Sequence, residues 1–291
     1  MDWTPGGMSS DVEDRRSEGG GGGGFGFGGG GGLGIGGIVI LLIISLITGR
    51  NYLSGMFGGG SSQPTAQVEQ SQQVQSGGAA DRDAQLISFV LDDTQKTWTK
   101  IFDDDGKRYR HAKLVLFRNA TYSGCGQAQS ATGPFYCPSD EKVYIDLGFW
   151  DELRQFGGST ADFAQGYVIA HEIGHHIQKL LGTEARVQQM MQSQPGQKNH
   201  LSVEVELQAD CFAGVWAHST EQRGIVHPDD VTEALKAAAA VGDDHLQKMQ
   251  RGTVSPESFT HGSSAERERW FNRGLAQGTV DACNTFAGVD Q

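Results

Sequence analysis

Residues 171–175 read His-Glu-Ile-Gly-His, and this short pattern restricts the fold of the chain more than any other feature. Apolar residues recur at helical spacing from residue 161 onward, Ser159 or Thr160 could cap the start, and Gly182 is a typical stop signal. The pattern is therefore expected in the middle of a helix. Side chains four residues apart on a helix point the same way, about 6 Å apart along the axis, so both imidazoles could hold one ion.

Two imidazoles on one helix suit Zn²⁺, which needs a third protein ligand and an open position for water in a catalytic site. The metal lowers the pKa of that water toward 7, and Glu172 is close enough to accept its proton. We therefore predict His171 and His175 as zinc ligands and Glu172 as the general base. Gly174 is costly in a helix interior, and a glycine between the two ligands allows the close approach of another backbone or of the metal shell. His176 points about 100° away from His175 and is expected in a supporting or surface position.

A second predicted helix, residues 202–217, carries Glu206 and Asp210 four positions apart on one face. This is the arrangement of the gluzincins, with Glu206 as third ligand and Asp210 accepting a hydrogen bond from a ligand histidine. Glu204 is the competing ligand, but Gln208, four positions further on, cannot act as a charged acceptor. Two acids on a solvated helix face are the alternative interpretation.

A loop histidine, His261, precedes a predicted helix over residues 263–275 that carries Arg267 near its start. In zincins, a hydrogen-bond donor that does not bind the metal often stabilises the oxyanion of the tetrahedral intermediate. His261 and Arg267 are candidates for that catalytic role. Helix capping by Ser263 or Ser264, together with a surface arginine, would explain the same segment without a function.

Three separated stretches carry a resemblance to a known family: residues 171–176, 206–214 and 260–271. In this order they resemble the bacterial family of predicted neutral zinc metallopeptidases, and the similarity covers about residues 80 to 288. The resemblance implies a small membrane-anchored peptidase with the same three ligands and the same general base. The third stretch is also similar to the membrane-bound gluzincins of the CAAX-protease and heat-shock protease group, whose several membrane spans are absent here.

The first 80 residues differ sharply in composition from the rest. A glycine tract leads into an apolar stretch without charge, from which we predict one transmembrane helix over residues 31–49. Residues 1–30 would form a disordered Gly-rich cytoplasmic tail, and residues 50–81, rich in Gly, Ser and Gln, a flexible linker. A cleaved signal peptide is the alternative, but no small-residue cleavage site follows closely.

The flanks of the apolar stretch predict its orientation. Arg15 and Arg16 precede it, Arg50 alone follows closely, and residues 51–80 contain no lysine or arginine. This bias places the N-terminus in the cytoplasm. We therefore expect a single-pass protein of the cytoplasmic membrane, with residues 82–291 outside the cytoplasm.

The chain has four cysteines, an even number that suits an oxidising compartment. Cys125 and Cys137 bracket a short loop between apparent strands and are expected to pair. By elimination Cys211 would pair with Cys283, which would attach the C-terminal tail to the helix that carries Glu206. Reduced, buried thiols are the alternative.

The globular part, residues 82–291, is predicted to have an α+β, zincin-like (gluzincin) fold. A helix over 86–100, strands over 113–117 and 142–147, the two metal helices and covering helices over 229–241 and 263–275 follow in order. A strand beside the metal helix could pair with an extended peptide. The net charge of -12 argues against a nucleic-acid partner.

These features together predict a membrane-anchored endopeptidase that hydrolyses peptides or proteins with one Zn²⁺ per chain. The competing hypothesis is a non-catalytic scaffold or binding protein of the cell envelope that keeps the zinc fold. Glu172 favours the enzyme, because a metal scaffold needs no general base.

Overall fold

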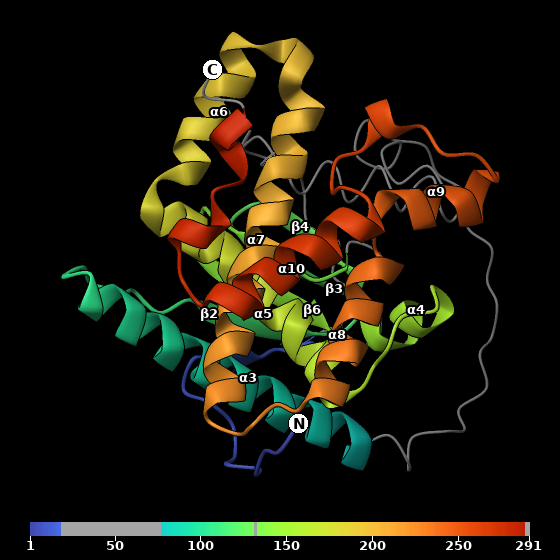
Figure 1. Cartoon of the computed structure of the whole chain (residues 1–291). Coiled ribbons are helices and arrows are strands. Elements are labelled where there is room, and N and C mark those ends of the chain that lie inside the picture. The colour runs from blue at the N-terminus through green and yellow to red at the C-terminus, as the bar shows by residue number, and fades with distance from the viewer. Residues whose placement is uncertain (19–76, 131–132, 289–291) are drawn as a thin grey trace.

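The computed structural model describes residues 1–18, 77–130 and 133–288 (Figure 1). The predicted transmembrane helix, residues 31–49, lies outside these ranges, as does most of the predicted linker. Within the described ranges, no helix combines the length and the apolar character that crossing a membrane requires. The fold is α+β and mostly helical, as expected.

A four-stranded sheet forms one layer, in the order β1-β2-β6-β5. β1 is parallel to β2, β2 is parallel to β6, and β5 is antiparallel to β6. The predicted strands are confirmed to within one residue as β2 and β6, whereas β1 and β5 were not anticipated. The bounds are β1 Val12–Asp14, β2 Lys113–Phe117, β5 Phe135–Cys137 and β6 Lys142–Asp146.

The two faces of the sheet bury different partners, because successive side chains of a strand point to opposite faces. One face packs on the main helical core through Leu114, Leu116, Val143 and Ile145. The other face carries Val115, Phe117 and Tyr144, which pack with Ala128 and Cys137. Ala128 comes from an antiparallel hairpin of β3 (Ala120–Ser123) and β4 (Gly126–Gln129).

Helix α5, Asp162–Leu181, carries the HExxH pattern through the middle of the molecule (Figure 1). It ends at Gly182 in the left-handed conformation, as predicted, but it starts after Ala161 rather than at a Ser159 or Thr160 cap. Helices on several sides contact it. These are α3 Gly77–Asp104, α6 Thr183–Ser193, α7 Lys198–Gln222 and α8 Pro228–Ala240.

Three further helices complete the helical layer: α4 Phe149–Gln155, α9 Asp243–Arg251 and α10 Ser264–Gln277. Helix α10 lies across α7 and is capped at its N-terminus by Ser263, whose side chain forms a capping box with Glu266. Ser263 therefore has the capping role that the sequence suggested for it or for Ser264.

The first 18 residues correct the prediction of a disordered tail that extends to residue 30. They run along α3 and the sheet, drawn in blue next to the N label of Figure 1. The amide of Asp2 donates to the carbonyl of Ile225 (2.7 Å), and the indole of Trp3 donates to Asp162 (2.7 Å). β1 then joins the sheet. This segment is short and charged, so its apolar pattern is too brief to signal a strand, and the partners that order it are distant in the sequence.

The predicted linker also ends earlier than expected, because α3 begins at Gly77 rather than near Leu86. Residues 77–81 therefore belong to a helix.

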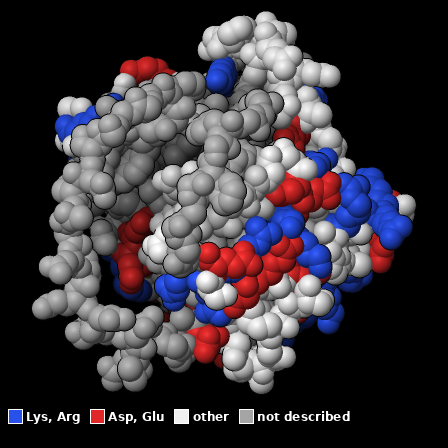
Figure 2. Space-filling view, turned by 180° about the vertical axis from the view of Figure 1, so that it is seen from behind, with Lys and Arg blue, Asp and Glu red and all other residues white. Residues whose placement is uncertain are grey.

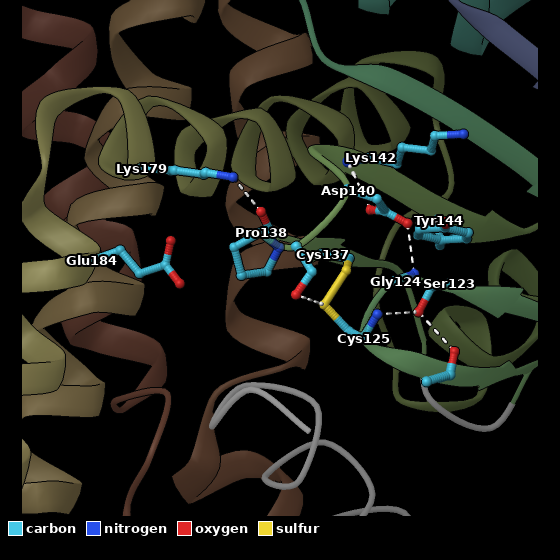
Figure 3. The surroundings of a disulfide bond; sticks show 12 residues. Ser123, Gly124, Cys125, Cys137, Pro138, Asp140, Lys142, Tyr144, Lys179 and Glu184 are labelled. Atoms are coloured by element: carbon cyan, nitrogen blue, oxygen red, sulfur yellow. Dashed lines mark hydrogen bonds between the residues drawn. A yellow bond between two sulfur atoms is a disulfide. The ribbon is translucent and has the colours of Figure 1, made fainter. Parts of the chain in front are cut away.

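Both predicted disulfides are formed, Cys125–Cys137 and Cys211–Cys283. The first attaches the β3–β4 hairpin to the end of β5 (Figure 3). Asp140 supports this junction by accepting hydrogen bonds from the Gly124 amide and the Tyr144 hydroxyl, each at 2.7 Å.

The surface of the described residues carries charges of both signs. Figure 2 shows lysine and arginine side chains interspersed with aspartate and glutamate on one face of the molecule. Exposed ion pairs of this kind contribute little to stability.

Candidate metal centre

The metal centre lies where α5 and α7 approach each other closely. A Cβ atom added to Gly174 would come within 3.0 Å of both the Cα and the carbonyl oxygen of Ala209. Gly174 is therefore required for this approach, as its position between the two histidines indicated. Ala209 lies between Glu206 and Asp210 on α7, so the close contact brings both acids to the imidazoles.

His171, His175 and Glu206 converge on one point. Their candidate ligand atoms all lie within 4.8 Å of one another. The Nε2 atom of His171 is 3.2 Å from one carboxylate oxygen of Glu206, and Nε2 of His175 is 3.7 Å from the other. Two imidazole nitrogens and one carboxylate fit the three-ligand set of a catalytic zinc site with an open position.

Asp210 holds the imidazole of His171 from behind. The Nδ1 atom of His171 lies 2.8 Å from Oδ1 of Asp210, which leaves Nε2 to face Glu206. Asp210 is fully buried and also accepts a hydrogen bond from the hydroxyl of Tyr167. Burial alone would raise the pKa of Asp210, but Arg267 and His171 outweigh it and lower that pKa to about 2. Asp210 therefore stays ionised and fixes the His171 tautomer.

Arg267 is the charged partner of Asp210. Its Nε and Nη2 atoms donate to the two carboxylate oxygens at 2.8 and 2.9 Å, and the side chain is only 4% exposed. The catalytic role considered for Arg267 placed it at the oxyanion, whereas the structure places it behind Asp210.

A close crossing of α7 and α10 brings Arg267 to this position. A Cβ atom on Gly214 would be 2.1 Å from the carbonyl oxygen of Phe271, and one on Gly274 would be 2.0 Å from that of Cys211. Only glycine at both positions permits this contact.

His175 is held by neutral groups instead. Its Nδ1 atom is 2.9 Å from the side-chain oxygen of Gln178, one helical turn further along α5. The amide nitrogen of Gln178 donates to the carbonyl of Val205 (2.6 Å) and to the side chain of Gln208 (3.2 Å). Gln208 in turn donates to the carbonyl of Cys283 at 2.9 Å. The tail attached by the second disulfide thus supports this histidine.

Glu172 is buried beside the cluster, with 8% of its surface exposed. Burial raises the pKa of its carboxyl group above the usual value, and the two histidines only partly oppose this shift. A raised pKa suits a group that must take up and return a proton near neutral pH.

His261 reaches the same region from the loop before α10. This loop packs on α7, since a Cβ on Gly262 would be 3.2 Å from Leu207. The buried carboxylate of Asp243 organises the loop by accepting three backbone N–H groups, those of residues 260, 261 and 262, at 2.6 to 3.1 Å. Burial lowers the pKa of His261, but Glu206 and Asp243 outweigh it and raise that pKa.

Other polar residues named from the sequence lie elsewhere. Glu204 is outside the metal cluster, which contains Glu206 as expected. His176 is buried, with one ring nitrogen 2.9 Å from the Tyr136 hydroxyl and the other 2.7 Å from the Arg110 carbonyl. His176 therefore supports α5 against β5.

The sequence analysis missed three contributors to the site: Tyr167, Gln178 and Asp243. Tyr167 precedes His171 by four residues, so its helical spacing could have signalled a shared face. Gln178 follows His175 by three residues and carries the same signal. No sequence signal marked Asp243, because its partners are backbone amides of a loop whose position depends on tertiary packing.

Comparison with known proteins identifies the family of this chain. The sequence profile of a family described as "Putative neutral zinc metallopeptidase" matches residues 1–286. The uncharacterized protein YpfJ of Escherichia coli K12 is 47% identical over 287 residues, which cover 98% of this chain and 99% of YpfJ. The uncharacterized protein Rv2575 of Mycobacterium tuberculosis H37Rv is 44% identical over 193 residues, covering 62% of this chain and 64% of that protein.

No solved structure matches the chain. The profile match extends the resemblance seen in the sequence, which began near residue 80, to the N-terminal segment. On the profile match and the relationship to YpfJ, the chain belongs to this neutral zinc metallopeptidase family.

Proposed function

We propose that the protein is a zinc-dependent endopeptidase of the gluzincin type. The observation that carries this proposal is the convergence of two histidines and Glu206 beside a fourth group, Glu172, that is buried and has a raised pKa. A site that only bound metal would not need a buried, proton-accepting carboxylate next to the ligands.

The donor set fits one Zn²⁺, held by His171, His175 and Glu206. Zinc bound there would supply an acidified water and polarise a peptide carbonyl. Glu172 would accept a proton from the attacking water and later deliver it to the leaving amine. Asp210 would keep His171 in the tautomer that presents Nε2, with Arg267 and Tyr167 holding Asp210 in place.

His261 is proposed to stabilise the negative oxygen of the tetrahedral intermediate. An imidazole N–H is a suitable hydrogen-bond donor to such an oxygen, and the ring of His261 lies 3.4 Å from the carboxylate of Asp243. Asp243 acts as a positioning residue, because it fixes the backbone of the loop that presents His261. Arg267 acts on catalysis only through Asp210.

The substrate is proposed to be an extended peptide beside β5. This strand ends the sheet order, so no strand of the described chain pairs with its outer edge. Lys179 of α5 donates to the carbonyl of Pro138 just after β5 and pairs with Glu141 at 3.0 Å, and the first of these contacts is visible in Figure 3. The end of β5 is thus held close to the metal helix, and main-chain pairing along the outer edge of β5 would bind peptides with little dependence on side chains.

The two disulfides support a location for the metal domain outside the cytoplasm, in an oxidising compartment. The uncharged apolar stretch within residues 31–49 is the proposed site of membrane attachment.

The direct test uses the purified full chain with an unfolded protein and a diverse peptide mixture as substrates. We expect cleavage at internal bonds, loss of cleavage after chelation, and recovery with about one zinc per chain. A His261→Asn variant should keep its zinc and lose most of the activity. A zinc-loaded protein that cleaves nothing in either substrate would favour the scaffold hypothesis instead.

A further inference from the structure

The residues on either side of segment 19–76 lie next to each other on one folded body. Arg16 and Asp81, which flank this segment, form an ion pair at 3.6 Å. The chain therefore leaves the metal domain and returns to it at nearly the same place.

β1 is an integral strand of the metal domain. The Leu114 amide donates to the Asp11 carbonyl (2.9 Å), and the Arg15 amide donates to the Leu116 carbonyl (2.8 Å), one bond at each end of the pairing. Val12 packs against the main hydrophobic core. β1 pairs in parallel with β2, and β2 and β6 are the two central strands of the sheet.

Side chains reinforce this pairing. Asp11 contacts three groups of the metal domain, the amine of Lys113 at 2.6 Å, the imidazole of His111 at 2.8 Å and the amide of Gln95 at 2.9 Å. Glu13 pairs with Lys142 of β6 at 2.6 Å. The family profile also begins at residue 1, so it includes this strand.

A sheet cannot have neighbouring strands on opposite sides of a membrane. One crossing between residues 19 and 76 would separate β1 from β2 and remove every contact described above. Two crossings need about 40 apolar residues, and the uncharged apolar stretch within residues 31–49 is long enough for one at most.

From this geometry we propose that the N-terminal segment, residues 1–18, and the metal domain lie on the same side of the membrane. Both ends of segment 19–76 then lie on that side. A chain that passes through the membrane once cannot satisfy this arrangement. The proposal differs from the single-pass topology expected from the sequence, in which the N-terminus faced the cytoplasm.

The test is the accessibility of two engineered cysteines, one in each part. Gly6→Cys lies in the N-terminal segment, where an added Cβ meets no atom within 4 Å, and Gln189→Cys lies on the exposed face of α6. Each variant of the full chain is treated in spheroplasts with a membrane-impermeant maleimide. The wild type, with its disulfides, measures the background.

We expect the two thiols to behave alike. Either both react in sealed spheroplasts, or both react only after the membrane is opened. If one thiol reacts in sealed spheroplasts and the other does not, the chain crosses once and the proposal is wrong. The result does not depend on peptidase activity. Equal protection of both thiols would support the topology while contradicting the proposed compartment.

A second measurement tests whether the N-terminal segment is docked in solution. Asp11→Asn in the full, detergent-solubilised chain should lower the unfolding midpoint by a few degrees, because three partners lose a charged acceptor. Asp103→Asn removes an exposed carboxylate near the end of α3 and serves as the control. Equal midpoints for both variants would show that the segment is not docked and would overturn the proposal.

Discussion

The two histidines of the metal centre face the same carboxylate, Glu206, yet they are supported in opposite ways. Behind His171 lies a buried ionic network in which Asp210 meets Arg267 and the hydroxyl of Tyr167. Behind His175 lies a chain of neutral amides. We call these the ionic arm and the amide arm.

The two arms also differ in what holds them. The ionic arm is held by the α7–α10 crossing at Gly214 and Gly274, so its geometry is set by the core. The amide arm ends on the carbonyl of Cys283, in the tail that the second disulfide attaches to α7. The position of His171 therefore depends on the packing of the helical core. The position of His175 depends in part on the C-terminal tail.

The largest effect is expected from breaking the ionic arm at Arg267. Arg267→Met would leave the buried charge of Asp210 without its main partner, which typically costs about 3–5 kcal/mol. Chemical denaturation of the metal-free protein would measure this loss. Arg269→Met, an exposed arginine of the same helix, should change stability by less than about 0.5 kcal/mol. Similar values for the two variants would contradict the ionic arm.

A smaller effect should separate the two arms in metal affinity. Asp210→Asn removes the charged acceptor of His171 and should weaken zinc binding by about 10- to 100-fold. Gln178→Met removes a neutral acceptor of His175 and should weaken it by less than about tenfold, because a neutral hydrogen bond is weaker. Competition with a zinc-sensitive chelator would measure both. A reversed order would show that the amide arm controls the metal.

Glu206→Gln sharpens the same experiment. Because Glu206 would bind the metal directly, the Glu206→Gln substitution should weaken zinc binding more than Asp210→Asn does. Equal and negligible effects of the two substitutions would show that neither acid belongs to the site.

The pH dependence of the metal-free protein tests the ionic arm in a second way. Burial opposes a charge on His171, but Asp210 and Glu206 outweigh burial and raise its pKa to about 10. Because the folded pKa exceeds the unfolded value of about 6.5, this stabilisation is complete below pH 6.5 and is lost as the pH rises toward 10.

The unfolding free energy of the metal-free protein should therefore fall across that interval. Bound zinc requires a neutral imidazole, so zinc affinity should rise over the same range. Denaturation curves at several pH values test the first point. In the Asp210→Asn variant the unfolding free energy should fall less over this pH interval. A larger fall would contradict the assignment of the pH dependence to the His171–Asp210 pair.

The sequence predicted the part of the site that helical geometry alone determines. The spacing of His171 and His175, and of Glu206 and Asp210, fixes each pair on one helix face whatever the surrounding fold. Gly174 indicated the close approach of another backbone or of the metal shell, and the backbone of Ala209 lies there. The central strands were also predictable, because their apolar runs are long.

What the sequence could not supply depends on contacts between distant elements. Arg267 was recognised as important, but its partner could be identified only from the α7–α10 crossing. Asp243 acts on backbone amides, which leave no mark in a sequence pattern. β1 consists of three residues, two of them acidic, and joins the sheet only because β2 offers it an edge.

The central claim is that the protein uses Glu172 to hydrolyse peptide bonds at a zinc site that does not need Glu172 as a ligand. Glu172→Gln is nearly isosteric, so the variant should fold and bind about one zinc per chain with unchanged affinity. Its amide cannot accept a proton, and loss of general acid–base catalysis commonly costs 10²- to 10⁴-fold in rate.

The decisive measurement is therefore the rate of peptide hydrolysis by wild-type and Glu172→Gln proteins at equal zinc content. The account predicts that hydrolysis falls by about 10²-fold or more while zinc content stays the same. A Glu172→Gln protein that hydrolyses peptides as fast as the wild type at equal zinc content would contradict it.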